Sequence, residues 1–344
     1  MKKIFKKISL GILTVFALFT AYFFVGRAEP AQEIIWGVNF SQKQAEALGM
    51  DWQETYLALL DDLGVRDLKL ATYWNLIEKE ETKYNFDDLD WQINEAEKRG
   101  AKLLLAVGMK TPRWPECHEP DWVKNQKLSS RDISRRETKI KIQKLLLEYI
   151  EKIVSRYKDS KTIWAWQVEN EPFFPFGECP EAVLDKNFLK KEAELVRSLD
   201  ARRPVVISDS GEFSFWIEAA KLGDVVGITM YKKVWFGEIK KHITYPFPAI
   251  FYYRKAEIVN KLFGREVIGV ELQAEPWCLI YLLSDCPVQE QQKTMNLKQF
   301  QDNIEFAKNT GLSRHYLWGA EWWYWMKERQ GKPEIWQEAG KIFQ

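Results

Sequence analysis

From residue 34 onward, short apolar runs alternate with segments in which apolar residues recur at helical spacing. Such alternation is typical of βαβ units and a parallel sheet. The apolar runs predict eight strands, at 34–39, 67–73, 102–109, 162–169, 204–209, 225–231, 266–271 and 314–319. Helical patterns fall at 52–63, 89–99, 138–157, 187–199, 249–263 and 297–309. Eight strands can close a barrel, so we expect one α/β domain, a (β/α)8 TIM barrel, over residues 33–344.

An open, doubly wound sheet is the competing architecture. It is disfavoured because no Gly-rich phosphate loop follows the first predicted strand. Glycines at the ends of several helical patterns, Gly64, Gly100 and Gly311, are predicted to be left-handed C-caps.

Residues 1–32 carry a different pattern, that of an N-terminal hydrophobic segment. Four lysines within the first seven residues precede an uncharged run from Ile8 to Gly26, which Arg27 ends. This run is longer than the apolar region of a signal peptide (about 7–15 residues) and close to the roughly 18–20 residues that span a bilayer. We therefore expect a single-pass anchor in the cell membrane, with the N-terminus in the cytoplasm and an extracytoplasmic barrel. A cleaved signal peptide and a secreted protein are the alternative.

Charge and composition exclude several kinds of partner. The chain has 50 Lys and Arg against 49 Asp and Glu, so no net field favours nucleic acid. Its three histidines, His118, His242 and His315, lie far apart without metal-ligand spacing, and we expect no metal and no cofactor. We expect a monomer.

Two glutamates stand where predicted strands end. The run Gln-Val-Glu-Asn-Glu-Pro, from Gln167 to Pro172, ends the fourth strand, and Glu271 ends the seventh. Catalytic groups of parallel barrels gather at the C-terminal ends of the strands. Two carboxylates there are the minimum apparatus for cleaving a glycosidic bond. Two further glutamates lie close by: strand alternation turns Glu169 to the same side as Glu171, and Glu275 falls in the following loop.

These residues resemble glycoside hydrolase clan A, the superfamily of retaining (β/α)8-barrel glycosidases, over nearly the whole chain from about residue 34. The resemblance rests on Asn170-Glu171-Pro172 with Glu271, and is supported by Tyr231, Trp318 and the segment from Trp74 to Asp90. That segment looks like a pattern of clan members that act on β-galactosides and β-xylosides.

The resemblance implies a retaining hydrolase that cleaves a β-linked glycoside or polysaccharide, with Glu171 as acid/base and Glu271 as nucleophile. It further implies that Asn170 binds the sugar 2-hydroxyl and that Tyr231 holds Glu271. Trp318 would form the floor of the −1 subsite, and Trp74 would also contact the substrate.

Three positions depart from the clan's pattern. Lys69 stands where many members carry Arg, Met109-Lys110 where the third strand often ends in His, and Thr229 where a His often precedes the tyrosine. A lysine cannot reproduce a bidentate guanidinium contact. These departures leave open a non-catalytic or weakly active carbohydrate-binding barrel at the cell surface. An envelope transglycosylase is a further alternative, because it would use the same residues and differ only in the acceptor.

The long loops after the predicted strands carry aromatic residues and all four cysteines. Trp114 and Trp277 are candidate sugar platforms, although an aromatic plug that anchors its loop is an equal alternative. Cys117, Cys179, Cys278 and Cys286 allow three pairings, and buried free thiols are the other possibility. Adjacency in a barrel favours Cys117 with Cys179 and Cys278 with Cys286.

Overall fold

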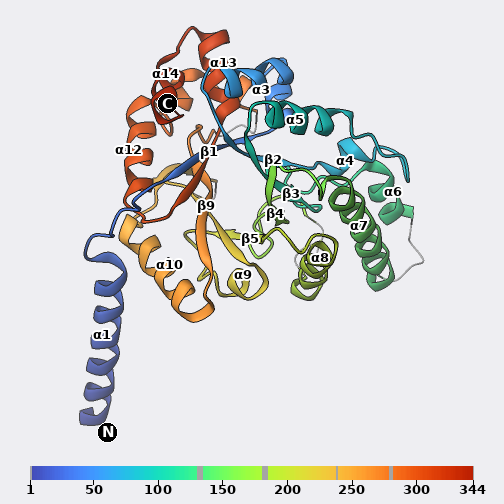
Figure 1. Cartoon of the computed structure of the whole chain (residues 1–344). Helices are drawn as coiled ribbons and strands as arrows, with labels where there is room; N and C mark the ends of the chain where they lie inside the picture. The colour runs from blue at the N-terminus through green and yellow to red at the C-terminus, as the bar shows by residue number, and fades with distance from the viewer. Residues whose placement is uncertain (1, 130–134, 180–184, 238, 279–281, 344) are drawn as a thin grey trace.

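The computed structural model describes residues 2–129, 135–179, 185–237, 239–278 and 282–343. Eight parallel strands form a closed barrel in the order β1-β10-β9-β6-β5-β4-β3-β2, which confirms the predicted (β/α)8 architecture (Figure 1). The barrel strands are β1 (Ile35–Phe40), β2 (Asp67–Ala71), β3 (Lys102–Val107), β4 (Ile163–Val168), β5 (Val205–Ser210), β6 (Val225–Met230), β9 (Glu266–Gln273) and β10 (Arg314–Trp318). Each lies within a few residues of a predicted strand.

Helices connect the strands on the outside of the barrel. They are α2 (Gln42–Ala47), α3 (Trp52–Asp61), α4 (Trp74–Ile77), α5 (Asp87–Lys98), α6 (Asp121–Ser129), α7 (Arg135–Tyr157), α8 (Lys186–Leu199), α9 (Ile217–Leu222), α10 (Ala249–Phe263), α11 (Val288–Gln291), α12 (Leu297–Lys308), α13 (Ala320–Gln330) and α14 (Glu334–Phe343). The six predicted helices correspond to α3, α5, α7, α8, α10 and α12. The shorter helices, α13 and α14 were not predicted from the sequence. The antiparallel hairpin of β7 (Lys233–Phe236) and β8 (Lys241–Thr244) was not predicted either.

Local signals account for the helix ends. The Asp51 side chain accepts hydrogen bonds from the backbone N–H groups of Gln53 and Glu54 and so caps the N-terminus of α3. The three predicted C-cap glycines all have positive φ, at +74°, +67° and +73° in chain order, as a left-handed C-cap requires.

Apolar side chains fill the inside of the barrel. Leu104 from β3, Ala165 from β4, Val206 from β5 and Val270 from β9 are fully buried there in one cluster. Below them, Asp67 accepts hydrogen bonds from Tyr316 and Arg314. The barrel interior is therefore a packed core, and among the described residues the room for a ligand lies at the mouth of the barrel.

The N-terminal segment forms helix α1 (Lys2–Phe24), which projects from the barrel beside α10 (Figure 1). Its last turn packs on α10, where the rings of Phe23 and Phe251 lie 5.9 Å apart. In the part of the chain that the structure describes, no helix has both the length and the apolarity needed to cross a membrane. The predicted membrane-spanning anchor is thus not confirmed.

Candidate active site

A pocket of about 480 Å³, open to solvent on one side, lies at the C-terminal mouth of the barrel. Both predicted catalytic glutamates line it. Its described lining consists of Glu116, Glu171, Phe174, Phe176, Ser210, Glu212, Phe213, Thr229, Tyr231, Val234, Tyr245, Glu271 and Trp277. The rings of Phe213, Phe174, Phe176 and Trp277 contact one another in sequence and form an aromatic wall. Four carboxyl groups share the same pocket.

Glu271 lies in β9, two residues before the strand ends, and both of its carboxylate oxygens are held. Lys69 from β2 donates to Oε1 across 3.0 Å, and the Tyr231 hydroxyl donates to Oε2 across 2.9 Å. Glu271 and Lys69 are both buried, at 3% and 1% exposure. The lysine and the tyrosine therefore fix the orientation of the carboxylate, as attack by a nucleophile requires.

Glu171 follows β4 and has a left-handed backbone, with φ of +41°. Its N–H donates to Ser208 Oγ across 2.8 Å, and its Oε1 accepts from Thr229 Oγ1, also across 2.8 Å. Burial and the nearby negative charge of Glu271 raise the pKa of Glu171 to about 8, although the Thr229 hydrogen bond opposes this rise. This shift favours the protonated form of the Glu171 carboxyl group, the form that a general acid needs.

Asn170 is fixed between its neighbours by both ends of its amide group. Gln167 Nε2 donates to its Oδ1 across 3.1 Å, and its Nδ2 donates to Glu116 Oε2 across 3.2 Å. These bonds settle which way the amide faces. Asn170 is buried and is not among the described residues that line the pocket, but it contacts the lining residue Glu116.

Glu169 does not share the side of Glu171, contrary to the expectation from strand alternation. Both residues have positive φ, +58° and +41°, so the period-two pattern ends at the last residue of β4. The Glu169 carboxylate instead accepts from the backbone N–H groups of Met109 and Lys110, at 2.9 and 2.6 Å. These two hydrogen bonds hold the backbone at the start of the loop after β3.

Trp318 lies at the end of β10 and is held by a buried charged group. Its Nε1 donates to Glu275 across 2.8 Å, and the Arg113 guanidinium stacks 4.0 Å over its ring. Arg113 also pairs with Glu275 and, at 3.0 Å, with Glu321. Trp318 and Lys69 border a second, smaller cavity, and neither is among the described residues that line the pocket of Glu171 and Glu271. The place of Trp318 at the floor of the −1 subsite stays a prediction.

Trp74 is not part of the pocket, which corrects the expectation that it contacts substrate. Its side chain is fully buried, stacks on Tyr149 at 5.3 Å and donates to Glu78 Oε2 across 2.7 Å. Trp114 lies nearer, at the edge: it is 38% exposed and meets the ring of Phe176, a pocket residue, at 6.0 Å.

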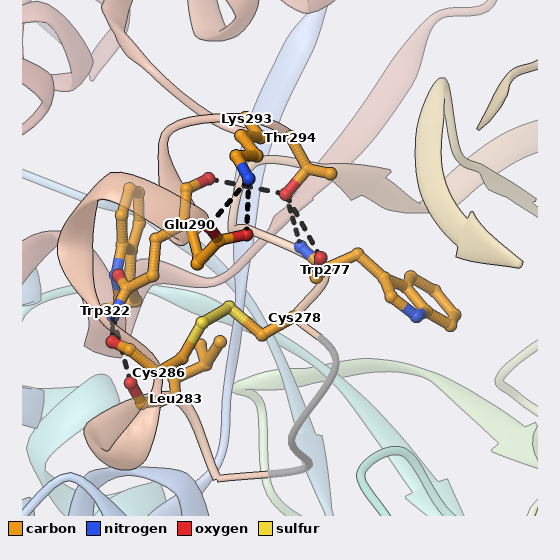
Figure 2. The surroundings of a disulfide bond; sticks show 9 residues. Trp277, Cys278, Leu283, Cys286, Glu290, Lys293, Thr294 and Trp322 are labelled. Atoms are coloured by element: carbon orange, nitrogen blue, oxygen red, sulfur yellow. Dashed lines mark hydrogen bonds and ion pairs between the residues drawn. A yellow bond between two sulfur atoms is a disulfide. The ribbon is translucent and has the colours of Figure 1, made fainter. Parts of the chain in front are cut away.

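Trp277 forms part of the aromatic wall, with its ring 5.4 Å from that of Tyr231. Figure 2 shows how its loop is fixed: the Trp277 backbone exchanges hydrogen bonds with the Thr294 hydroxyl at 2.9 and 3.2 Å, next to the Cys278–Cys286 disulfide. The indole points away from that disulfide. The second disulfide joins Cys117 to Cys179, so both favoured pairings are confirmed.

Several pocket residues were not predicted from the sequence, among them Glu116, Glu212 and the phenylalanines of the aromatic wall. Glu116 lies in the loop after β3, and Phe174, Phe176 and Phe213 lie in the loops after β4 and β5. No periodicity marks such positions. Their only sequence signal is membership of long loops that follow barrel strands.

Comparisons with known proteins agree with this architecture. Residues 44–221, just over half of the chain, match the model of glycoside hydrolase family 42, which is described as beta-galactosidase. The chain is 32% identical over 124 residues to a probable mannan endo-1,4-beta-mannosidase A of Aspergillus clavatus, covering 36% of this chain and 32% of that protein. It is also 32% identical over 127 residues to mannan endo-1,4-beta-mannosidase F of Aspergillus fumigatus, covering 36% and 26%. The matched region is about a third or less of the length of these curated relatives.

Solved structures show the same fold. A beta-galactosidase of the Antarctic haloarchaeon Halorubrum lacusprofundi aligns with a TM-score of 0.55 at 16% identity, over 83% of this chain and 52% of that one. Xylanase 10B of Thermotoga maritima gives a TM-score of 0.55 at 16% identity, over 90% of this chain and 95% of that one. With its closed eight-stranded barrel and the family match over more than half of its length, the chain belongs to glycoside hydrolase family 42, in clan A.

Proposed function

We propose that this protein is a retaining β-glycosidase in which Glu171 is the acid/base and Glu271 the nucleophile. One observation carries the proposal: the two carboxyl groups line one pocket in opposite electrostatic surroundings. Glu271 has a lysine and a tyrosine hydroxyl on its oxygens, whereas burial and the charge of Glu271 raise the pKa of Glu171. Pairs of carboxyl groups with pKa values pushed apart are typical of glycoside hydrolysis.

In the first step, Glu271 attacks the anomeric carbon while Glu171 donates its proton to the leaving oxygen, and a covalent glycosyl-enzyme forms. The ester has no negative charge, so one of the causes that raise the pKa of Glu171 disappears. Glu171 can then take a proton from the water that hydrolyses the ester. Lys69 and Tyr231 keep the oxygens of Glu271 in place for attack.

The aromatic wall supports a carbohydrate substrate. Sugar rings present apolar faces that stack on aromatic side chains, and Trp277, Phe176, Phe174 and Phe213 stand together along one side of the pocket. The family description and the names of the relatives suggest β-galactosides, β-mannosides and β-xylosides as first substrates.

The test uses aryl β-galactosides, β-mannosides and β-xylosides, with the anomer of the first-formed product read by NMR. Glu271→Gly should abolish turnover, and azide should then give the inverted α-glycosyl azide. Glu171→Ala should still cleave activated leaving groups, and azide should give the retained β-glycosyl azide. The exposed Glu80→Gln is the matched control. Carbohydrate binding without turnover would instead support the carbohydrate-binding barrel, and an inverted first product would exclude retention.

We further propose that the barrel works outside the cytoplasm. The Cys117–Cys179 and Cys278–Cys286 disulfides support export, because structural disulfides persist in oxidising compartments. Cell fractionation with non-reducing peptide mapping tests this and separates a cell-associated from a released protein. Free thiols at all four cysteines in the isolated protein would contradict it.

A further inference from the structure

Lys110 is a lysine of the loop after β3 whose side chain is fully buried, at 0% exposure. Its ammonium group donates hydrogen bonds to backbone carbonyls, that of Glu171 across 2.9 Å and that of Phe174 across 2.8 Å. Neither acceptor carries a charge. Burying a charged group costs free energy unless its surroundings compensate for the lost water, so the place of this ammonium group needs an explanation.

The backbone and the side chain of Lys110 both hold the segment that carries Glu171. The Lys110 carbonyl accepts from the N–H of Asn170 across 2.6 Å, directly before Glu171. The N–H of Phe174 donates to the Glu171 carbonyl across 3.0 Å, so residues 171–174 form a turn, and the ammonium group bonds the carbonyls at both of its ends. Because Glu171 has a φ of +41°, which L residues rarely adopt, this turn needs such support.

The charge of Lys110 acts on several buried carboxyl groups at once. Burial raises the pKa values of Glu171, Glu116 and Glu169, and the positive charge of Lys110 opposes the rise at each of them. The other titratable groups around Glu171 in the pocket are Glu271 from β9, Glu212 from the loop after β5 and Tyr231 from the residue after β6. None of these carries a positive charge, so Lys110 is the cation that counts against the negative charge of Glu271 at Glu171.

A purely structural role would not require a charge at this position. The Glu171 carbonyl already accepts from the N–H of Phe174, and a neutral donor could satisfy the Phe174 carbonyl. Lys255 of α10 is a useful comparison, because it is also buried, at 3% exposure, and donates to a loop carbonyl, that of Gly211, across 2.6 Å. Its ammonium group lies 3.8 Å over the ring of Trp216. Only Lys110 of these two lysines joins its hydrogen bonds to the backbone of the proposed acid/base.

We propose that Lys110 is a positioning residue for the acid/base: its ammonium group fixes the backbone turn that aims Glu171 into the pocket and supplies a buried positive charge that acts on the Glu171 carboxyl group. The proposal rests on the proposed role of Glu171. Lys110 touches no substrate, and it acts on the reaction only through Glu171. Its loss should therefore affect the steps that need proton transfer and spare those that do not.

The test compares two aryl β-glycosides of the same sugar, one with a phenyl and one with a dinitrophenyl leaving group. Lys110→Met should lower kcat/KM for the phenyl glycoside by about 10²-fold, because the proton donor is misplaced. It should lower kcat/KM for the dinitrophenyl glycoside by less than about 3-fold, because that leaving group needs little protonation. The alkaline limb of kcat/KM for the phenyl glycoside should shift to higher pH, since removing the cation raises the pKa of Glu171.

Two further variants separate the charge from the hydrogen bonds. Lys110→Gln keeps a donor without the charge, so it should shift the alkaline limb as Lys110→Met does while losing less activity on the phenyl glycoside. Lys255→Met removes the comparable buried lysine and should affect both glycosides in the same proportion, with the alkaline limb unmoved. Equal losses on both glycosides in Lys110→Met, with an unmoved limb, would show a merely structural role and overturn the proposal.

An NMR titration of carbon-13-labelled glutamate carboxyl groups gives a readout that does not depend on turnover. The Glu171 signal is assigned through its absence in Glu171→Gln. Its pKa should be higher in Lys110→Met than in the wild type, and Lys110→Gln supplies the same comparison if the methionine variant does not fold. An unchanged or lower pKa of Glu171 would overturn the proposal. A wild type that cleaves neither aryl glycoside would count against the glycosidase function, and the titration would still decide whether Lys110 acts on Glu171.

Discussion

Thr229 donates a hydrogen bond to the carboxyl group of Glu171 across 2.8 Å, and in the sheet it pairs with Glu271 of the neighbouring strand. A single residue of β6 therefore lies between the proposed acid/base and the proposed nucleophile. The clan pattern often has histidine here, so this chain replaces a titratable side chain with a neutral hydroxyl. The residue that hydrogen-bonds Glu171 from β6 is therefore one that does not itself titrate.

Removing the Thr229 hydroxyl should move the pH profile of the enzyme. The hydrogen bond lowers the pKa of Glu171 because it stabilises the ionised carboxylate, against the larger raising effects of burial and Glu271. Thr229→Val keeps the shape and removes the donor. The pKa of Glu171 should rise, and the alkaline limb of kcat/KM should shift to higher pH.

Thr229→Ser is the matched control, since it keeps the hydroxyl and should keep the alkaline limb near its wild-type position. The measurement is a pH profile of kcat/KM for a good aryl substrate with all three proteins. An alkaline limb that moves to lower pH in Thr229→Val would contradict the assignment of Glu171 as the acid.

Lys69 should matter for stability as well as for turnover. Its ammonium group and the Glu271 carboxylate form a buried pair at 3.0 Å. Lys69→Met leaves the carboxylate buried without its cation, which in comparable cases destabilises a protein by about 3–5 kcal/mol. The free energy of unfolding from denaturant titration should fall by that order, and kcat should fall by about 10²-fold through misplacement of the nucleophile.

Lys69→Arg tests whether charge is sufficient at this position. Arginine restores the cation and should recover most of the stability lost in Lys69→Met. Its longer planar group must fit where the lysine side chain is almost fully enclosed, so we expect kcat below wild type. Equal stability of the methionine and wild-type proteins would show that the pair is not required by the fold.

The two disulfides should contribute unequally. Cys117–Cys179 spans a sequence separation of 62 residues and Cys278–Cys286 a separation of only 8. Chain entropy predicts about 4 kcal/mol for the longer loop and about 2.5 kcal/mol for the shorter. Paired Cys→Ser variants, compared by denaturant titration, should show this order. We also expect the Cys117/Cys179 variant to lose more activity, because that bond adjoins Glu116.

The barrel could be predicted from the sequence because each strand is a short apolar run between helical patterns. The positions of Asn170, Glu171 and Glu271 in the site could be predicted because these residues lie at strand ends. What could not be read depends on contacts between distant loops. Glu116 lines the pocket from a loop that the Cys117–Cys179 disulfide ties to the loop after β4. Trp74 and Trp277 are both tryptophans near strand ends, and only tertiary packing sends one into the core and the other into the pocket.

A second pair of carboxyl groups, outside the pocket, should make the fold less stable as the pH rises. The carboxyl group of Glu169 interacts with that of Glu192 in α8, and both residues are fully buried. Burial raises the pKa of Glu169 to about 7, and burial together with the charge of Glu169 raises the pKa of Glu192 well above its usual value. A raised pKa in the folded state means that stability is present below about pH 4.3, the pKa of an unfolded glutamate, and is lost as the pH rises through the folded-state values.

Glu192→Gln should reduce that loss. The amide is neutral at every pH and can donate a hydrogen bond to the Glu169 carboxylate. The variant therefore lacks the carboxyl group that, in the wild type, keeps its proton in the folded state. Between about pH 5 and 7, the free energy of unfolding should fall less steeply than in the wild type, by about 1.4 kcal/mol per pH unit. The other buried carboxyl groups contribute to both proteins and cancel in the comparison. Denaturant titrations at several pH values give the slope of the free energy of unfolding against pH for both proteins. Parallel slopes would mean that Glu192 does not hold a proton in the folded state. A variant that is more stable than the wild type at pH 8 and equally stable at pH 4 would show that it does.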